Sequence, residues 1–214
     1  MSIVRIETSV PYDSNIYLVK GRSAVLIDTG TGLDARGTIG SVWKELAGTR
    51  LSAVLLTHCH ADHIGGLRAV TEEFGCPAYA YDPDASMISS GDRSVTVADM
   101  LGVDLGPVPC KVLRPTDTFD LGDHVLEVIP TPGHTAGGVC FYDRITRSLF
   151  SGDTLFNGGF GRTDFPTGSS RQLYQSLISL RNVNIGTLYP GHGPGTDDGP
   201  GAVAEAISMM EGTY

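Results

Sequence analysis

The sequence predicts an α/β protein in which two mostly separate sheets pack together and helices lie outside them. Short apolar runs rich in β-branched residues, punctuated by Gly, Pro and Asp, occur in both halves of the chain. Helix-like stretches lie between and after these runs, an arrangement that favours sheets covered by helices. The 214 residues, 41% of them hydrophobic, suit one globular domain spanning 1–214.

The first half contains four strand-like runs and two helix-like stretches. The strand-like runs cover residues 3–8, 15–20, 24–28 and 51–56. The helix-like stretches cover about 33–46 and 62–74, and Gly75 is a typical C-terminal stop for the second. Residues 84–110 have the weakest periodicity, so we expect a flap or insert there.

The second half repeats this pattern. Its strand-like runs cover residues 125–131, 138–143, 147–153 and 185–190. Its helix-like stretches cover about 169–180 and 200–211. Several of these strand-like runs end in loops that contain a histidine or an aspartate beside Gly or Pro.

Composition and charge disfavour several classes of protein. The formal net charge of −9 disfavours a nucleic-acid partner, which must be held by neutralising phosphates. No apolar run approaches the roughly 20 residues needed to cross a bilayer, and the N-terminus lacks the layout of a signal peptide. The four cysteines form no C-x-x-C pair and indicate reduced thiols. We therefore expect a cytoplasmic protein that is not bound to a membrane.

The sequence LLTHCHADHIGG holds three of the six histidines. If the chain leaves its strand in an extended form, His58 and His60 project to one side and Cys59 projects to the other, where it packs against the sheet. Asp62 and His63 begin the next helix and can face the same cavity. Nitrogen and oxygen ligands in one loop suit a divalent metal such as zinc, and also iron or manganese.

Three later loops carry polar residues in a similar setting. His134 lies in TPGHTAGG, Asp153 in FSGDT and His192 in YPGHGPG, each after a strand-like run. Gly or Pro beside each residue lets the backbone turn sharply and present the side chain at the edge of a sheet. His124, in LGDH, has no such motif and is interpreted as a turn residue.

These motifs, taken in order, resemble the metallo-β-lactamase superfamily. The resemblance runs from about residue 14 to 196 and rests on LIDTG, H-x-H-x-D-H, G-H-T, S-G-D and the last G-H. It implies a four-layer αβ/βα sandwich of two mixed sheets, with a two-metal site along one edge. It assigns His58, His60 and His134 to the first metal, and Asp62, His63 and His192 to the second, with Asp153 bridging both. Asp28, in LIDTG, is either a group that orients the site or a residue of the turn that ends its strand.

Two such metals, most simply zinc, lower the pKa of a shared water from 15.7 toward about 7 and so supply hydroxide at neutral pH. We expect this hydroxide to attack an electrophilic carbonyl, with the metals stabilising the oxyanion. Asp62 is the candidate catalytic residue, because it can accept the proton of the attacking water.

The branch of the superfamily is predicted from smaller differences. An aspartate at 153 argues against true β-lactamases, which carry a cysteine or no equivalent ligand there. The sequence GDTLFNGGFGRTDFPTG resembles both glyoxalase II-like thioester hydrolases and persulfide dioxygenases, whereas YPGHGPGT is nearer to the hydrolases. The prediction is a hydroxyacylglutathione hydrolase-like enzyme acting on S-2-hydroxyacyl thiols. The alternative is an oxidoreductase that converts a thiol persulfide at one iron held by His58, His134 and Asp153, and a non-catalytic metal-binding protein is the third hypothesis.

Arg162 is the candidate substrate-binding residue. In the hydrolases that this chain resembles, a basic residue at its position contacts a carboxylate of the thiol carrier. An ion pair with Asp164 is the competing interpretation. The tyrosine expected after the last histidine motif is absent, which leaves the identity of the thiol open. The expected partner is a small-molecule thioester, and the oligomeric state is also left open.

Overall fold

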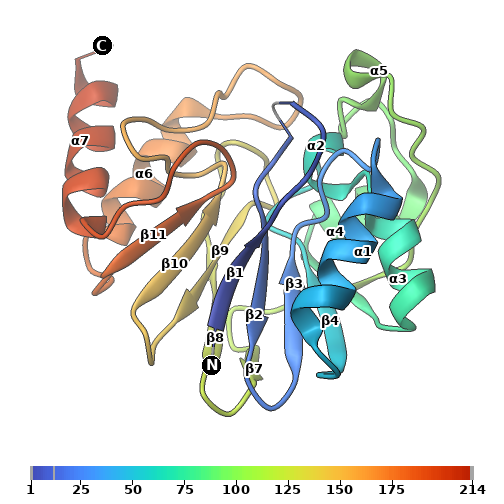
Figure 1. Cartoon of the computed structure of the whole chain (residues 1–214). Coiled ribbons are helices and arrows are strands. Elements are labelled where there is room, and N and C mark those ends of the chain that lie inside the picture. Colours follow the sequence, from blue (N-terminus) through green and yellow to red (C-terminus); the bar gives the residue numbers. More distant parts are fainter. Residues whose placement is uncertain (1, 12, 213–214) are drawn as a thin grey trace.

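Two mixed sheets form the centre of the protein, whose computed structural model describes residues 2–11 and 13–212 (Figure 1). The first sheet has the spatial order β1 (Ser2–Ile6), β2 (Ile16–Lys20), β3 (Ala24–Ile27), β4 (Leu51–Leu55), β5 (Ala78–Tyr81) and β6 (Cys110–Leu113). The second has the order β11 (Thr187–Pro190), β10 (Ser148–Gly152), β9 (Val139–Asp143), β8 (Val125–Pro130) and β7 (Thr118–Asp120). The first sheet is antiparallel from β1 to β3 and parallel from β3 to β6, and in the second only β10 and β11 are parallel.

Helices cover the outer faces of both sheets. The first half contributes α1 (Ala35–Leu46), α2 (Ala61–Ile64), α3 (Leu67–Phe74), α4 (Asp84–Ser90) and α5 (Ala98–Leu101). The second half contributes α6 (Ser170–Leu180) and α7 (Gly199–Glu211). In Figure 1, α1 and α3 lie beside the first sheet, and α6 and α7 lie beyond the second. The predicted α/β fold of two mixed sheets with outer helices is confirmed.

Three apolar interfaces hold the layers together. Because side chains alternate along a strand, neighbouring residues of β2 enter different interfaces. Leu18 packs toward the helices of the first half, together with Val42 of α1. Val19 packs between the sheets, where it meets Phe141 of the second sheet. A third cluster joins the second sheet to α6 and α7, and each fully buried aliphatic side chain in such clusters contributes about 1.5–3 kcal/mol.

The helix predicted over 62–74 is two helices, α2 and α3, separated by Gly65 and Gly66. The loop after β3 packs against this break. A Cβ added at Gly65 would lie 2.0 Å from the carbonyl oxygen of Thr31, and one at Gly66 would lie 2.4 Å from that of Thr29. The two glycines therefore let the loop that carries Asp28 approach the ligand-bearing α2 closely.

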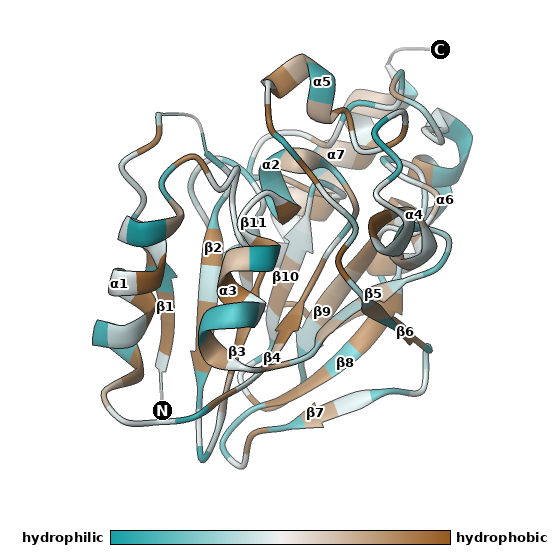
Figure 2. Ribbon diagram, turned by 90° about the vertical axis from the view of Figure 1, so that its right-hand side faces the viewer, coloured by the Kyte–Doolittle hydropathy of each residue, from teal (hydrophilic) through white to brown (hydrophobic). Residues whose placement is uncertain are grey.

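The segment 84–110 contains α4 and α5 and ends where β6 begins. Residues of α4 enter the core beneath the first sheet, whereas α5 stands away from the sheets near α2 (Figure 2). The sequence prediction lacks β5, β6 and β7, which are three or four residues long. The four cysteines are free thiols, and Cys59 is buried in the core of the first half. Within the described part of the chain, no helix has the length and apolar character that a membrane crossing needs.

Candidate metal centre

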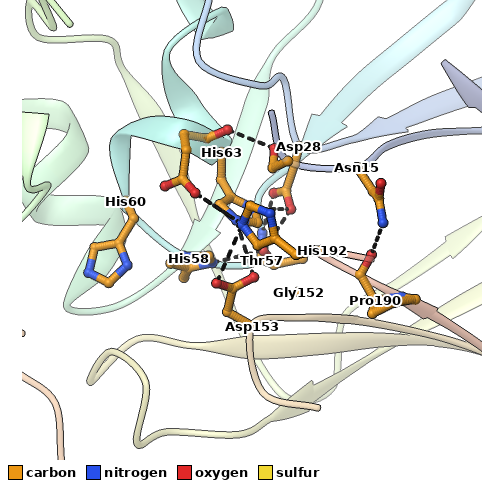
Figure 3. Close-up of polar contacts among 12 residues, drawn as sticks. Asn15, Asp28, Thr57, His58, His60, His63, Gly152, Asp153, Pro190 and His192 are labelled. Atoms are coloured by element: carbon orange, nitrogen blue, oxygen red, sulfur yellow. Dashed lines mark hydrogen bonds and ion pairs between the residues drawn. The ribbon is translucent and has the colours of Figure 1, made fainter. Parts of the chain in front are cut away.

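The predicted ligands lie at one edge of both sheets, where strands end. His58 and His60 follow β4, and Asp62 and His63 begin α2 directly after them. The other three ligands come from the second half of the chain. They lie in the β8–β9 loop, after β10 and after β11, and are His134, Asp153 and His192. Figure 3 shows His58, His63, His192 and Asp153 pointing toward one another.

The seven residues fall into three groups that could hold a metal ion, and within each group the ligand atoms lie within 4.8 Å of one another. The groups are His58, His60 and His134; Asp62, His63 and His192; and His58, His63 and Asp153. The first two have the same members as the two ligand sets that the family resemblance implies. The third takes one histidine from each of the others, so Asp153 lies between them.

Buried polar atoms that lack hydrogen-bond partners indicate whether this cluster suits a metal ion. Nε2 of His58 and His63 and Oδ1 of Asp153 are buried without a hydrogen-bond partner, although His63 Nε2 and Asp153 Oδ1 lie only 3.2 Å apart. Leaving one such atom unsatisfied costs about 1–3 kcal/mol. A divalent cation that prefers nitrogen and oxygen ligands would satisfy all three, so the residues fit a metal centre.

Hydrogen bonds to Asp28 orient two of the histidines. Its Oδ2 lies 2.8 Å from His63 Nδ1, which leaves His63 Nε2 facing the cluster. Thr57 donates its backbone N–H to Oδ1 and its hydroxyl to Oδ2 of the same carboxylate. Because that hydroxyl has one proton, Thr57 Oγ1 must accept a hydrogen bond from His58 Nδ1, 3.0 Å away. Asp28 thus fixes the tautomers of both rings, and it does so from the turn that ends β3.

His134 is oriented by the backbone instead. Its Nδ1 donates to the carbonyl oxygen of Arg162 over 2.7 Å. Its Nε2 then faces the ligand cluster, 2.9 Å from His60 Nδ1 and 3.6 Å from Asp153 Oδ2. The loop that contains Arg162 therefore positions one of the predicted ligands.

The electrostatics of the cluster suit a cation. Burial, reinforced by His63, holds the pKa of His58 well below its usual value, and burial lowers the pKa of His60 to about 3. Burial alone would raise the pKa of Asp62, but His63 and His192 outweigh it and lower that pKa. At neutral pH two imidazoles are therefore neutral and the carboxylate is ionised, as metal ligands must be.

His63 behaves differently because it lies among carboxylates. Burial opposes its charged form, yet Asp153, Asp62 and Asp28 outweigh burial and raise its pKa well above the usual value. A proton on His63 compensates part of this negative charge, and a bound cation would take its place.

Comparison with known proteins agrees with this geometry. Residues 10–192 match the model of the Metallo-beta-lactamase superfamily. The chain belongs to this superfamily. Over 190 residues, 85% of this chain and 88% of its relative, it is 37% identical to the "Probable metallo-hydrolase MJ0888" of Methanocaldococcus jannaschii.

Two solved structures of similar proteins extend the comparison. The "BLEG-1 B3 metallo-beta-lactamase" superposes with a TM-score of 0.81 at 30% identity, over 93% of this chain and 95% of that one. "TTHA1623 in a di-iron-bound form" superposes with a TM-score of 0.77 at 32% identity, over 94% of this chain and 97% of that one. The metallo-β-lactamase fold and a metal-binding cluster of histidines and aspartates are thus properties of this chain.

Asp84 supports the metal centre but is absent from the sequence prediction. It is 1% exposed and begins α4. Its Oδ2 accepts hydrogen bonds from the backbone N–H of Cys59 and from Thr135 Oγ1, and its Oδ1 accepts one from Gly137 N–H. The carboxylate therefore joins the loop of His58 and His60 to the loop of His134. The only signal in the sequence is an acid at the start of a short helix, inside the segment expected to be a flap.

Asn15 makes a similar connection to the last ligand loop. Its side-chain Nδ2 donates to the carbonyl oxygen of Pro190 over 2.8 Å (Figure 3). It also donates to the carbonyl oxygen of Gly193 over 2.9 Å. These two carbonyls flank His192. A residue of the loop before β2 thus holds a ligand loop of the second sheet, a contact that the sequence does not indicate.

His124 lies outside the metal centre and, among the described residues, belongs to none of the three ligand groups. It occupies the turn between β7 and β8, as expected, but it is only 1% exposed. Its Nδ1 lies 2.5 Å from Asp143 Oδ2. His124 therefore forms a buried pair that ties this turn to the end of β9.

A cavity of about 440 Å³ opens beside His60, Asp62 and Asp153, and Arg162 lies in its wall. The Arg162 guanidinium, which the resemblance assigns to a carrier carboxylate, forms two 2.6 Å hydrogen bonds to Asp164. It also lies 3.9 Å from the ring centre of Phe165. The competing ion pair with Asp164 is thus present, and it already neutralises the positive charge of Arg162.

Proposed function

We propose that this protein is a metal-dependent thioester hydrolase of the glyoxalase II-like branch, acting on S-2-hydroxyacyl thiols. One observation carries the proposal: two ligand groups, joined through Asp153, open onto a cavity large enough for a small molecule. Relatives named as probable metallo-hydrolases support hydrolysis in general. The thioester is inferred from the sequence around Arg162 and is the part that experiment must test.

The residues of this chain have distinct tasks in such a reaction. Bound at the two ligand groups, divalent ions would lower the pKa of water and polarise a carbonyl group. Asp62 Oδ2 lies 3.1 Å from His192 Nε2. The lowered pKa of Asp62 keeps this carboxylate ionised at neutral pH, ready to accept a hydrogen bond from water. Apolar and aromatic side chains line the cavity beside these groups.

The identity of the metal remains part of the proposal. We expect two divalent ions, with zinc first, because all seven ligand atoms are imidazole nitrogens or carboxylate oxygens. Iron is the main alternative, since a similar structure is titled as a di-iron-bound form. Manganese accepts the same types of ligand.

The one-iron persulfide dioxygenase is the weaker candidate. It requires only His58, His134 and Asp153, and it gives no role to the second group of Asp62, His63 and His192. β-Lactam hydrolysis is suggested by the name of one similar structure, but the aspartate at 153 argues against it.

Purification without added metal, followed by elemental analysis and assays of the same sample, tests the proposal. We expect about two ions per chain and hydrolysis of S-lactoylglutathione or a related S-2-hydroxyacyl thioester. One iron per chain with oxygen uptake on a glutathione persulfide would replace this function with the dioxygenase. Cleavage of a β-lactam but of no thioester would also overturn it.

A further inference from the structure

Apolar side chains line two sides of the cavity beside the metal centre, and we call them the apolar wall. The wall consists of Val97, Met100, Leu101, Phe156, Phe160 and Phe165. Three of these residues belong to α5 and the position before it, and three belong to the loop that follows Asp153. The wall thus spans both halves of the chain.

The α5 side of the wall exposes large apolar groups to solvent. Met100 is 68% exposed and Leu101 is 44% exposed, although both line the cavity. Exposed apolar side chains that gather around a concave site are typical of a surface that binds an apolar ligand. Both groups would lose contact with water if such a ligand lay between α5 and the phenylalanines.

Contacts with the ligand-bearing helix hold α5 in place. Ala98 packs against Ala61 of α2, and the backbone N–H of Ala61 donates to the carbonyl oxygen of Thr96 over 2.8 Å. Arg93 adds an ion pair to Asp99, at 2.5 Å. Since Ala61 stands between His60 and Asp62, α5 is fixed to the ligand loop itself.

The phenylalanine side of the wall contacts the ligand rings. Phe165 lies edge-on to His60 with ring centres 5.5 Å apart, and Phe156 lies edge-on to His192 with ring centres 6.2 Å apart. A group lying against this side of the wall would therefore sit directly beside the reacting centre.

The charges around the cavity disfavour an anionic carrier. Arg162 is the one Lys or Arg side chain among the described residues that line it, and its guanidinium is paired with Asp164. A carrier with free carboxylates would find no arginine or lysine here that is free to pair with them. An uncharged carrier does not require such a partner.

We infer that the substrate carries an uncharged apolar substituent, a straight alkyl or aryl group, which lies against the apolar wall. This inference rests on the proposed thioester hydrolysis, although binding to the wall does not require cleavage. The substituent can belong to the acyl group or to the thiol, because both adjoin the carbonyl carbon. Two series of substrates distinguish these sources.

The first series lengthens the acyl chain on one neutral thiol, N-acetylcysteamine. The second keeps a lactoyl group and lengthens an n-alkyl thiol. In one of the two series, we expect kcat/KM of the metal-loaded enzyme to rise about fourfold per added methylene until the cavity is filled, equivalent to about 0.8 kcal/mol each. The series that responds identifies the side of the thioester that meets the wall. Equal rates along both series would overturn the inference.

Matched variants locate the effect. A double variant, Met100→Gln with Leu101→Gln, should lose about tenfold or more in kcat/KM on the longest substrates and little on the shortest. Ile145→Gln is the control, because Ile145 is 50% exposed in the turn before β10, at the opposite end of that strand from Asp153. A thermal melt of each variant checks that it is folded. An equal loss on short and long substrates would assign α5 a role other than binding the substituent.

Arg162→Ala tests the opposing idea of an anionic carrier. We expect KM for S-lactoylglutathione to stay within about twofold of the wild-type value, with a lower melting temperature because the pair with Asp164 is lost. A KM raised at least tenfold with unchanged kcat, the signature of lost uniform binding, would favour the anionic carrier and overturn the inference.

A binding measurement separates this inference from the proposed function. Calorimetric titration of the purified protein with uncleavable S-alkyl thioethers of N-acetylcysteamine should give affinities that rise with chain length. Such binding without cleavage of any thioester would support the apolar wall and reject the hydrolase. Cleavage of thioesters without any dependence on chain length would keep the hydrolase and reject the apolar wall.

Discussion

Asp84 accepts a hydrogen bond from Thr135 Oγ1 at 2.7 Å, although 51 positions of chain separate the two residues. The same carboxylate oxygen accepts the backbone N–H of Cys59. One buried acid therefore sets the distance between the loop of His58 and His60 and the loop of His134.

Asp84→Asn should weaken the metal centre without touching a ligand. An amide NH₂ cannot accept the hydrogen bonds that one carboxylate oxygen receives. We expect metal affinity to fall about 10- to 100-fold and the free energy of unfolding to fall by about 1–3 kcal/mol. Competition with a chromogenic chelator measures the affinity. Asp82→Asn is the control, since among the described residues the Asp82 side chain accepts hydrogen bonds from Ser86 alone. Equal losses in both variants would contradict the role of Asp84.

Asp153→Ala should abolish hydrolysis and remove most of the second metal, because Asp153 lies between the two ligand groups. His124→Ala should leave metal content and kcat near their wild-type values. It should still lower the free energy of unfolding by about 1–3 kcal/mol, since Asp143 loses a buried partner. Elemental analysis and urea unfolding of both variants make the comparison. Loss of metal in His124→Ala would contradict the assignment of His124 to a position outside the metal centre.

The buried Asp143 should make stability depend on pH in the acid range. Burial opposes its charge, but hydrogen bonds from Thr146 and His124 outweigh burial and lower its pKa below the usual 3.8. Its contribution is therefore fully present above that value and is lost as the pH falls through the lowered pKa. Asp143→Asn should be less stable than wild type at neutral pH, and the difference should shrink as the pH falls below about 4. Urea unfolding of metal-free samples measures this; a constant difference across that range would contradict it.

Removal of the metals should lower the melting temperature. Ions that bind only the folded chain add about 2.7 kcal/mol when the free metal is at 100 times its dissociation constant. For a chain of this length, that amount corresponds to a shift of about 5–10 °C. Thermal melts with and without a chelator measure the shift, and re-addition of zinc should restore it. An unchanged melting temperature would mean that these residues bind no metal tightly.

The long strands and the ligands could be predicted from the sequence because their signals are local. A run of apolar, β-branched residues such as that of β3 indicates a buried strand without information from the rest of the chain. The ligands lie in turns that Gly and Pro indicate. β7 is three residues long, too short to show alternation. The division of 62–74 into α2 and α3 depends on the close approach of Thr31 to Gly65, a contact between distant segments.

The supporting residues could not be predicted for a related reason. Asp84 and Asn15 look like ordinary polar residues of loops and helix ends. Their importance comes from burial against loops that lie 51 and 175 positions away. Arg162 was assigned by its place in a motif, but the orientation of its side chain depends on Asp164 and Phe165.

The division of the ligands between the two halves of the chain has a consequence for biosynthesis. His58, His60, Asp62 and His63 precede β6, whereas His134, Asp153 and His192 follow β7. A nascent chain that has emerged only as far as β6 holds no complete ligand set, because each of the first two groups waits for a histidine from the second half. Tight metal uptake is then a late event that reports correct docking of the two sheets, and a chain arrested or misassembled before that point would remain without its metals.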